Sequence, residues 1–353
     1  MSHYEERLES DIAKIRKRIQ RMGAAVVAAV RSATQSALTC DAELATETIL
    51  GDLPINRQSR ELDHRCHIFI ARHLPSAGHL RYISSAMRLS KTLERVGDYA
   101  ETMSRAAIQL SVAPADPVKR DIEMMGRHAA NILEESLEAY IEGSVVRARA
   151  TKTKVGQYGT TFDKVFSDVM RVGAAGGQPM EDLFALMAVF NRLERILHQG
   201  KNICEQTIFA VTGEGKAEKT FDVLFVDGRN AGASLLAEHF CRKAYPEAGS
   251  FESAGWNVAE GTDDAFIEFA DSKGLDLRDT EPRSIDQVLG QIADYDLIID
   301  LVGGVREHLT RIPFHTTILS WSIEERSDPE AVYKQIAPRV SDLMDLLRGE
   351  DED

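Results

Sequence analysis

The sequence predicts a multidomain chain with an all-α N-terminal half and an α/β C-terminal half. Three observations lead to this prediction. The length of 353 residues suits about two domains, at roughly 100–200 residues each. Residues 5–212 show helical periodicity with almost no strand signal. From about residue 221, short apolar runs alternate with helical segments, which is typical of a doubly wound parallel sheet.

The all-α half, residues 1–212, is expected to form two three-helix bundles. Apolar residues in its first helix recur every three or four positions and make one stripe: Leu8, Ile12, Ile15, Ile19, Met22 and Val26. Glycine and proline place expected helix breaks near 51–54, 73–75, 113–117 and 173–177. About six helices follow from this pattern, in repeats at about 5–112 and 118–212.

The two groups of helices also share sequence. Residues 92–98 contain Leu-Glu-Arg-Val, and residues 191–198 contain Leu-Glu-Arg-Ile at a separation of 100 residues. Arg21-Met22-Gly23 is similarly echoed by Met124-Met125-Gly126. Matching segments at the same point of two equally long units indicate an internal duplication.

The α/β half is expected at residues 221–353, after a segment of linker composition at 213–220. The apolar runs 223–226 and 297–301 are predicted to be strands. Helices are predicted at 232–244, 262–274, 283–292 and 329–348. Because strands and helices alternate, the sheet should be parallel with helices on its faces.

The helical half contains several short motifs whose order and spacing match those of a known family. They are Asp52-Leu53-Pro54-Ile55-Asn56, Glu61, the segments 75–83 and 93–98, and, in the second repeat, 194–196 and 201–203. In these motifs the chain resembles the PhoU family, regulators of bacterial phosphate uptake and signalling. The resemblance implies negative regulation of phosphate uptake through the phosphate transporter ATPase and a sensor histidine kinase. We also expect a homo-oligomer.

The first repeat carries a candidate metal face. Glu94 and Asp98 are four residues apart, so on a helix their Cβ atoms lie roughly 5–6 Å from each other. Two such carboxylates repel each other unless a cation or a basic side chain lies between them. Asp52 and Asn56 would supply further oxygen atoms from the preceding helix.

Glu194 and His198 are the corresponding pair in the second repeat. Oxygen ligands with one imidazole suit iron, manganese, zinc or nickel, and the resemblance implies metal clusters at such E-x-x-x-D motifs. Residues 151–158 lack the acid that the family has there, and lysines in this segment would oppose a cation. The alternative is that the glutamates form surface ion pairs with Arg95, Arg195 or Lys91.

The loop after the first predicted strand, residues 227–234, reads Asp-Gly-Arg-Asn-Ala-Gly-Ala-Ser. It resembles the C-x5-R-S phosphate-binding loop of low-molecular-weight tyrosine phosphatases and arsenate reductases. Asp227 stands at the position of the cysteine nucleophile, and Ala233 at that of the arginine. The similarity continues through residues 253–256, 273–276, 296–300 and 321–325, where Glu325 would be a vestigial general acid.

These substitutions predict a pseudophosphatase. An aspartate can accept the backbone N–H groups of such a loop and so compete with phosphate for them. Arg229 would compensate only in part for the missing guanidinium, and Asn230 and Ser234 would brace the loop. We therefore expect no enzyme activity and a role in protein interaction, ligand sensing or dimerisation.

Two alternatives from other classes stay open. One is a phosphatase or arsenate reductase that uses Asp227 or a relocated cysteine such as Cys241 as its nucleophile. The other is a metal-storage or metal-sensing protein. Neither alternative changes the predicted fold.

Composition and charge limit the classes of partner and the cellular compartment that we expect for this protein. Residues 217–353 carry 29 acidic and 13 basic side chains, whereas residues 1–216 carry 27 acidic and 29 basic, and an acidic domain disfavours DNA binding. No apolar run approaches the ~20 residues that span a bilayer, and the N-terminus lacks a signal-peptide core. The four cysteines show no C-x-x-C spacing. We expect a soluble cytoplasmic protein with no membrane insertion.

Overall fold

The computed structural model describes residues 3–156, 161–216, 219–309, 312–313, 316–324 and 327–349. The chain divides into two compact units, Met1–Lys216 and Ala217–Asp353. The first unit is helical, and the second is built on a parallel sheet. Each unit has hydrophobic core clusters of its own.

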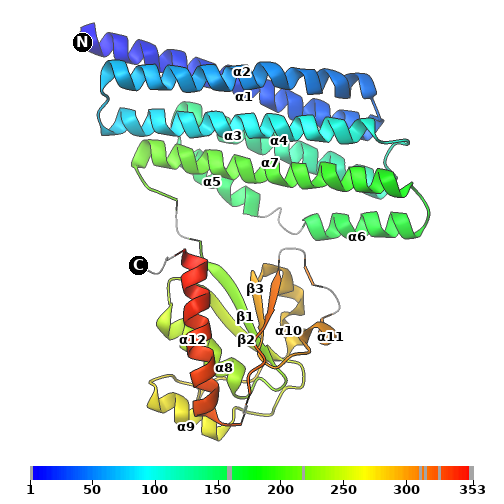
Figure 1. Cartoon of the computed structure of the whole chain (residues 1–353), viewed down its shortest axis with the longest axis vertical. Coiled ribbons are helices and arrows are strands. Elements are labelled where there is room, and N and C mark those ends of the chain that lie inside the picture. The colour runs from blue at the N-terminus through cyan, green and yellow to red at the C-terminus, as the bar shows by residue number, and fades with distance from the viewer. Residues whose placement is uncertain are drawn as a thin grey trace. The chain divides into compact units, whose positions relative to one another are not determined.

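The first unit starts with three long helices, α1 (His3–Thr39), α2 (Ala42–His73) and α3 (Ala77–Ile108), which lie side by side in Figure 1. Asp41 begins α2 as its N-cap and accepts a hydrogen bond from the Leu44 N–H at 3.0 Å. Cys40 turns the chain between α1 and α2 with a φ of 53°, and Leu74 ends α2 with a φ of 42°. The short turns fold the three helices into one antiparallel bundle, in which each helix contacts the other two.

The second repeat comprises α4 (Asp116–Glu142), α5 (Val145–Gly156), α6 (Thr161–Ala174) and α7 (Met180–Thr212). Gly143 ends α4 in the left-handed conformation with a φ of 66°, which glycine adopts without steric cost. One hydrophobic cluster contains buried residues of α1, α2, α3, α4 and α7. The two repeats therefore share a continuous core.

Two predictions about the helical half are wrong in detail. The predicted break at 51–54 does not exist, because α2 runs through it with Pro54 inside the helix. Buried residues such as Thr48, Ile55 and Ser59 pack one face of α2, and this packing outweighs the ~3 kcal/mol cost of an internal proline. The described residues of this unit form seven helices instead of six, since α5 and α6 replace one long helix, and α5 ends at Gly156.

The second unit contains the predicted parallel sheet. Its strands are β1 (Phe221–Asp227), β2 (Gly249–Gly255), β3 (Leu297–Asp300) and β4 (Thr317–Ser320), in the order β2-β1-β3-β4 with all neighbours parallel. The helices are α8 (Ala233–Ala244), α9 (Asp264–Ser272), α10 (Ile285–Val288), the 3₁₀ helix η1 (Leu289–Asp294), α11 (Val305–His308) and α12 (Pro329–Arg348). The predicted combination of a helical region with a doubly wound sheet is confirmed.

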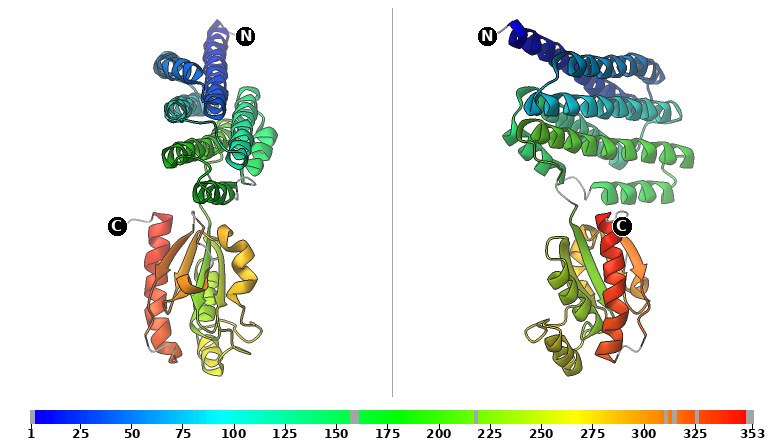
Figure 2. Two further views of the ribbon diagram at one scale, coloured as in Figure 1. Left: turned by 90° about the vertical axis from the view of Figure 1, so that its right-hand side faces the viewer. Right: turned by 60° about the vertical axis from the view of Figure 1, so that its left-hand side comes forward.

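Successive residues of β1 point into different cores. Val223 and Phe225 belong to the cluster built with α8, α9 and α12. Leu224 and Val226 belong to the cluster built with α10, η1 and α11. Helices thus cover both faces of the sheet (Figure 2), which explains why β1 is a continuous apolar run.

Replacing Gly126 by alanine is expected to destabilise the helical unit by about 1–3 kcal/mol. A Cβ atom at Gly126 of α4 would lie 2.3 Å from Cγ2 of Thr34 on α1, so one of the two helices would have to move. Urea unfolding followed by circular dichroism measures this change.

The matched control is Gly51→Ala within α2, where a Cβ atom meets nothing within 4 Å. This variant should gain about 1 kcal/mol, because alanine favours the helix over glycine. Equal unfolding midpoints for the two variants would contradict the close approach of α1 and α4.

Candidate functional site

The first candidate site lies at the carboxyl end of the sheet. Strand β1 ends at Asp227, and α8 begins six residues later at Ala233. After β1 the chain continues to β2 on one side of β1 and later to β3 on its other side. In doubly wound sheets, ligands bind at such a change of direction, in the crevice beyond the strand ends.

The carboxylate of Asp227 is the centre of this loop. Its Oδ1 accepts hydrogen bonds from the backbone N–H groups of Arg229 at 2.9 Å and Asn230 at 2.5 Å. Its Oδ2 accepts one from the N–H of Ser234 at 2.9 Å, in the first turn of α8. The side chain is 6% exposed. A fixed negative group therefore takes up amides that an oxyanion would otherwise use.

Asn230 holds the loop in shape from inside. It has a φ of 49°, in the left-handed region, and its side chain is fully buried. Its Nδ2 donates to the hydroxyls of Ser234 at 2.9 Å and Ser253 at 2.8 Å, and its Oδ1 accepts from the N–H of Arg283 at 2.6 Å. Asn230 thereby ties the loop to β2 and to the segment before α10.

The remaining predicted residues of this site provide no anion clamp. Ala233 is buried at the start of α8 and carries no charge. Arg229 is exposed and lines a cavity of about 380 Å³ together with Trp256 and Phe266. Glu325, the predicted vestigial acid, lies outside the described residues.

Asp300 also belongs to this region, although it was not predicted to be a site residue. It ends β3, where it is the register partner of Val226, and it is 2% exposed. Its carboxylate accepts from the N–H groups of Val302, Gly303 and Val305 at 2.8–3.2 Å. An aspartate that ends an apolar run and precedes a glycine pair was the available signal. Two neighbouring strands thus end in carboxylates that hold the backbone of the following turn.

The second candidate site is the acidic face between α2 and α3. Asn56 donates to Oδ2 of Asp52 at 2.5 Å, and Glu94 accepts from Ser59 at 3.1 Å and from Lys91 at 2.9 Å. Oδ1 of Asp52 and Oδ1 of Asn56 are buried, and neither has a hydrogen-bond partner within the described residues. These oxygens are available to a cation.

Repulsion among these acids is visible in their pKa values. Burial, then the charges of Asp98 and Glu101, raise the pKa of Asp52. Burial, then Glu94 and Glu101, raise that of Asp98. Glu101 is not among the predicted ligands, although it lies seven residues after Glu94 on the same helix, where residues share a face.

The donor chemistry of this face therefore suits a cation with a preference for oxygen ligands. Within the described ranges, however, no three His, Cys, Asp or Glu side chains gather closely enough to hold a metal ion. The oxygens of Asp52 and Asn56 fit such a ligand, but the side chains as placed do not complete a ligand set. Metal binding here stays a prediction.

The second repeat offers less to a cation. Glu194 and His198 both lie on α7, with Glu194 half-buried and His198 exposed. The lysines that were expected to oppose a cation are engaged elsewhere: Lys152 pairs with Glu205 at 3.2 Å, and Lys154 with Glu135 at 2.7 Å. Metal binding at Glu194 and His198 stays a prediction.

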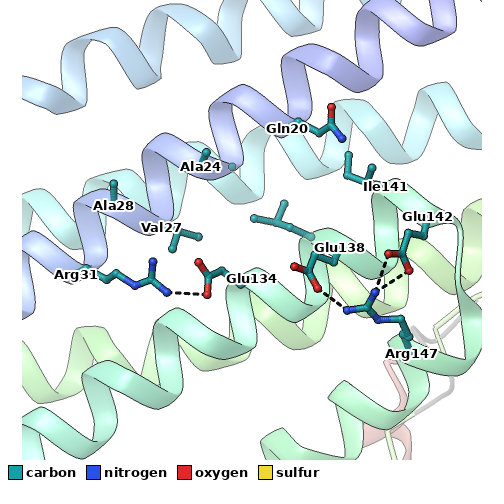
Figure 3. Close-up of a pocket in the computed structure, with 12 residues that line it drawn as sticks. Gln20, Ala24, Val27, Ala28, Arg31, Glu134, Glu138, Ile141, Glu142 and Arg147 are labelled. Carbon is teal, nitrogen blue, oxygen red and sulfur yellow. Dashed lines mark hydrogen bonds and ion pairs between the residues drawn. The ribbon is translucent and has the colours of Figure 1, made fainter.

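A groove of about 730 Å³ runs between α1 and α4 (Figure 3). Apolar residues such as Val27 and Ile141 line it. Arg31 pairs with Glu134 at 2.6 Å across the groove, and Arg147 binds Glu142 at 2.7 Å and also Glu138. Each of the three carboxylates that line the groove is therefore paired with an arginine.

Known protein families match both halves of the chain. Residues 19–107 and 122–207 match the PhoU domain, and residues 222–320 match the low molecular weight phosphotyrosine protein phosphatase family. The chain therefore joins a helical region that matches the PhoU domain to a C-terminal region that matches the low molecular weight phosphotyrosine protein phosphatase family. This confirms both resemblances.

Individual relatives align with the helical half of the chain. The phosphate-specific transport system accessory protein PhoU of Serratia marcescens is 24% identical over 212 residues, which is 60% of this chain and 87% of the relative. Its homolog in Pseudomonas aeruginosa is 29% identical over 218 residues, or 60% and 88%. The crystal structure of PhoU from Pseudomonas aeruginosa shares the fold, with a TM-score of 0.56, 24% identity and coverage of 58% and 99%. No helix in the described part of the chain is long and apolar enough to cross a membrane.

Replacing Asp227 by alanine should destabilise the C-terminal unit by about 1–3 kcal/mol, because three buried amides lose their acceptor. Thermal unfolding of the full chain, followed by the fluorescence of its two tryptophans, which both lie in this unit, measures the loss. The control is Asp263→Ala, since Asp263 is exposed and its side chain accepts a single amide, from Ala265. A loss no larger than that of the control would contradict the role of Asp227.

Replacing Asp52 by asparagine should stabilise the helical unit at pH 7 in metal-free buffer. The pKa of Asp52 is raised in the folded protein, so its contribution to stability is present below the unfolded pKa of ~3.9 and is lost as the pH rises through the folded value. The advantage of Asp52→Asn should therefore vanish near pH 4.

Unfolding midpoints measured between pH 4 and pH 8 test this expectation. Glu47→Gln is the control, because Glu47 lies exposed on the same helix. An Asp52→Asn midpoint below that of the wild type at pH 7 would contradict the inferred repulsion.

Proposed function

We propose that the chain is a PhoU-type regulator of phosphate uptake and of phosphate-responsive signalling. The observation that carries this proposal is the pair of PhoU domain matches, which fill most of the helical half. Relatives that align over this half are named as accessory proteins of phosphate-specific transport. The chain would restrain uptake when phosphate is plentiful.

The C-terminal domain would act without catalysis in this role. Support comes from Asp227, which stands where the family has its nucleophile and accepts three backbone N–H groups. The buried Ala233 offers no positive charge to a phosphoryl group. We infer that the domain is a pseudophosphatase that serves as an interaction or sensing module.

The partners implied by this role are the phosphate transporter ATPase and a sensor histidine kinase, met in the cytoplasm. The C-terminal unit is strongly acidic, with 29 acidic and 13 basic residues at positions 217–353. Such a charge favours association with basic protein surfaces and disfavours nucleic acid. Self-association as a homodimer belongs to the same proposal.

An enzymatic role has less support. As a relocated nucleophile, Cys241 would need an accessible thiolate, but it is 1% exposed, and burial raises the pKa of its thiol. Aspartyl nucleophiles in phosphoryl transfer work beside a metal ion, and the carboxylate of Asp227 is already bound to amides. The burial of Cys241 and the amide contacts of Asp227 therefore favour the non-catalytic proposal.

Metal binding is a second candidate function of the helical half. Its support is the pair of buried, unpartnered oxygens on Asp52 and Asn56, beside the repelling charges of Asp98 and Glu101. Iron, zinc, nickel or manganese would relieve this repulsion and tie α2 to α3. Glu94 would contribute from α3, and Glu194 with His198 would form the corresponding site on α7.

Deleting the gene in its source organism should raise phosphate uptake in phosphate-rich medium, because the restraint on the transporter is lost. Uptake of radiolabelled phosphate measures the effect. The wild-type gene should restore low uptake, and Cys241→Ala should restore it equally well, since no thiol chemistry is required.

Two results would overturn this proposal. One is uptake that is unchanged by the deletion. The other is hydrolysis of p-nitrophenyl phosphate by the purified full chain that Asp227→Asn or Cys241→Ala abolishes. Unchanged uptake would rule out the regulatory role. Hydrolysis that is lost in either variant would rule out only the proposed inactivity of the C-terminal domain.

A further inference from the structure

A small cavity in the helical unit lies where α1, α3, α4 and α7 meet. Its volume is about 240 Å³, and its polar lining comes from Arg16, Tyr82, Tyr140, Glu142 and Thr207. Pockets for drug-sized ligands usually measure roughly 300–1,000 Å³. This cavity therefore suits an ion or a very small metabolite. Its walls come from both repeats, α1 and α3 from the first and α4 and α7 from the second.

Arg16 brings an unmatched positive charge to this cavity. Its neighbours on α1 are paired, Lys14 with Asp11 at 2.8 Å and Arg18 with Glu61 at 2.7 Å. Arg16 has no carboxylate partner in the described part of the chain, and its Cζ lies 5.9 Å from the centroid of the Tyr82 ring. A guanidinium with five N–H donors is thus available at the cavity.

Tyr82 brings a hydroxyl that donates to no acceptor within the described residues. Its oxygen is buried, and the neighbouring Arg16 guanidinium offsets part of the rise that burial causes in the pKa of the phenol. The Tyr140 ring stacks on that of Tyr82 at 5.8 Å, with its own hydroxyl 2.7 Å from Oγ of Ser85. Burial raises the pKa of both phenols, so both stay protonated at neutral pH. An unpaired buried hydroxyl costs free energy until an acceptor reaches it.

The other polar groups of the cavity are already engaged. Both oxygens of Glu142 accept from Nη1 of Arg147 at 2.7 Å, which neutralises the carboxylate of the lining. The hydroxyl of Thr207 donates to the carbonyl of Ile203 at 3.0 Å. What remains for a ligand is a guanidinium and a phenol, which are both donors. Such a pair calls for an acceptor with negative charge.

We propose that this cavity binds a small oxyanion, phosphate or a small carboxylate, through the guanidinium of Arg16 and the hydroxyl of Tyr82. Arg16 lies on α1 and Tyr82 on α3, next to side chains of α4 and α7. The bound anion supplies the acceptor that the Tyr82 hydroxyl lacks, and it stabilises the junction of the two repeats.

Isothermal titration of the full chain with inorganic phosphate tests the proposal, with succinate in a second arm, at constant sodium chloride and with no other oxyanion. One anion should bind per chain in at least one arm, and the arm that binds identifies the source. Arg16→Gln should weaken binding at least about tenfold, as expected for the loss of a charge-assisted bond. Tyr82→Phe should weaken it less and leave the unfolding midpoint unchanged or higher.

The matched control is Arg18→Gln, which removes the same charge from the same helix and should leave binding within about twofold. Equal effects of Arg16→Gln and Arg18→Gln would overturn the site. So would the absence of heat in both arms. Phosphate binding that persists in Arg16→Gln would place the anion elsewhere, such as at the loop of Asp227, and would also overturn the proposal.

Discussion

The hydrogen bonds that the Asp227 carboxylate accepts from three backbone amides hold the loop after β1 in the C-terminal domain. In an oxyanion loop, converging N–H groups are satisfied when the ligand arrives. Here Arg229, Asn230 and Ser234 donate to a side chain of the same loop, so the loop is complete without a ligand. Asp227, which stands at the cysteine position of the loop that this segment resembles, thus has a structural role in the domain.

The helical half presents the opposite electrostatic situation. Negative charge at Asp227 is matched by donors. In the helical half, burial and the charges of Asp98 and Glu101 raise the pKa of Asp52, and oxygen atoms of Asp52 and Asn56 have no hydrogen-bond partner within the described residues. The Asp227 carboxylate is therefore satisfied within its own loop, whereas a cation would relieve the repulsion at the acidic face between α2 and α3.

Two cavities of the helical half lie at the boundary between its two repeats. Both the groove between α1 and α4 and the smaller cavity at Arg16 lie between helices of different repeats. Close approach at Gly126 and Gly200, where a Cβ atom would lie 2.3–2.4 Å from a neighbouring side chain, fixes the helices in the core.

Local patterns in the sequence determined much of this protein: the helical periodicity, the apolar strands, the duplication, and a phosphatase-type loop in which aspartate and alanine replace cysteine and arginine. These features depend on residues close in sequence, so their spacing alone reveals them.

Tertiary structure decided the remaining features. Packing on α1 and α3 carries α2 through Pro54, whereas the corresponding helix of the second repeat is divided into α5 and α6. Asp300 joins the loop region, and Arg16 meets Tyr82, only because distant segments fold together. No local pattern encodes such encounters, since they follow from how whole helices and strands bury their apolar faces.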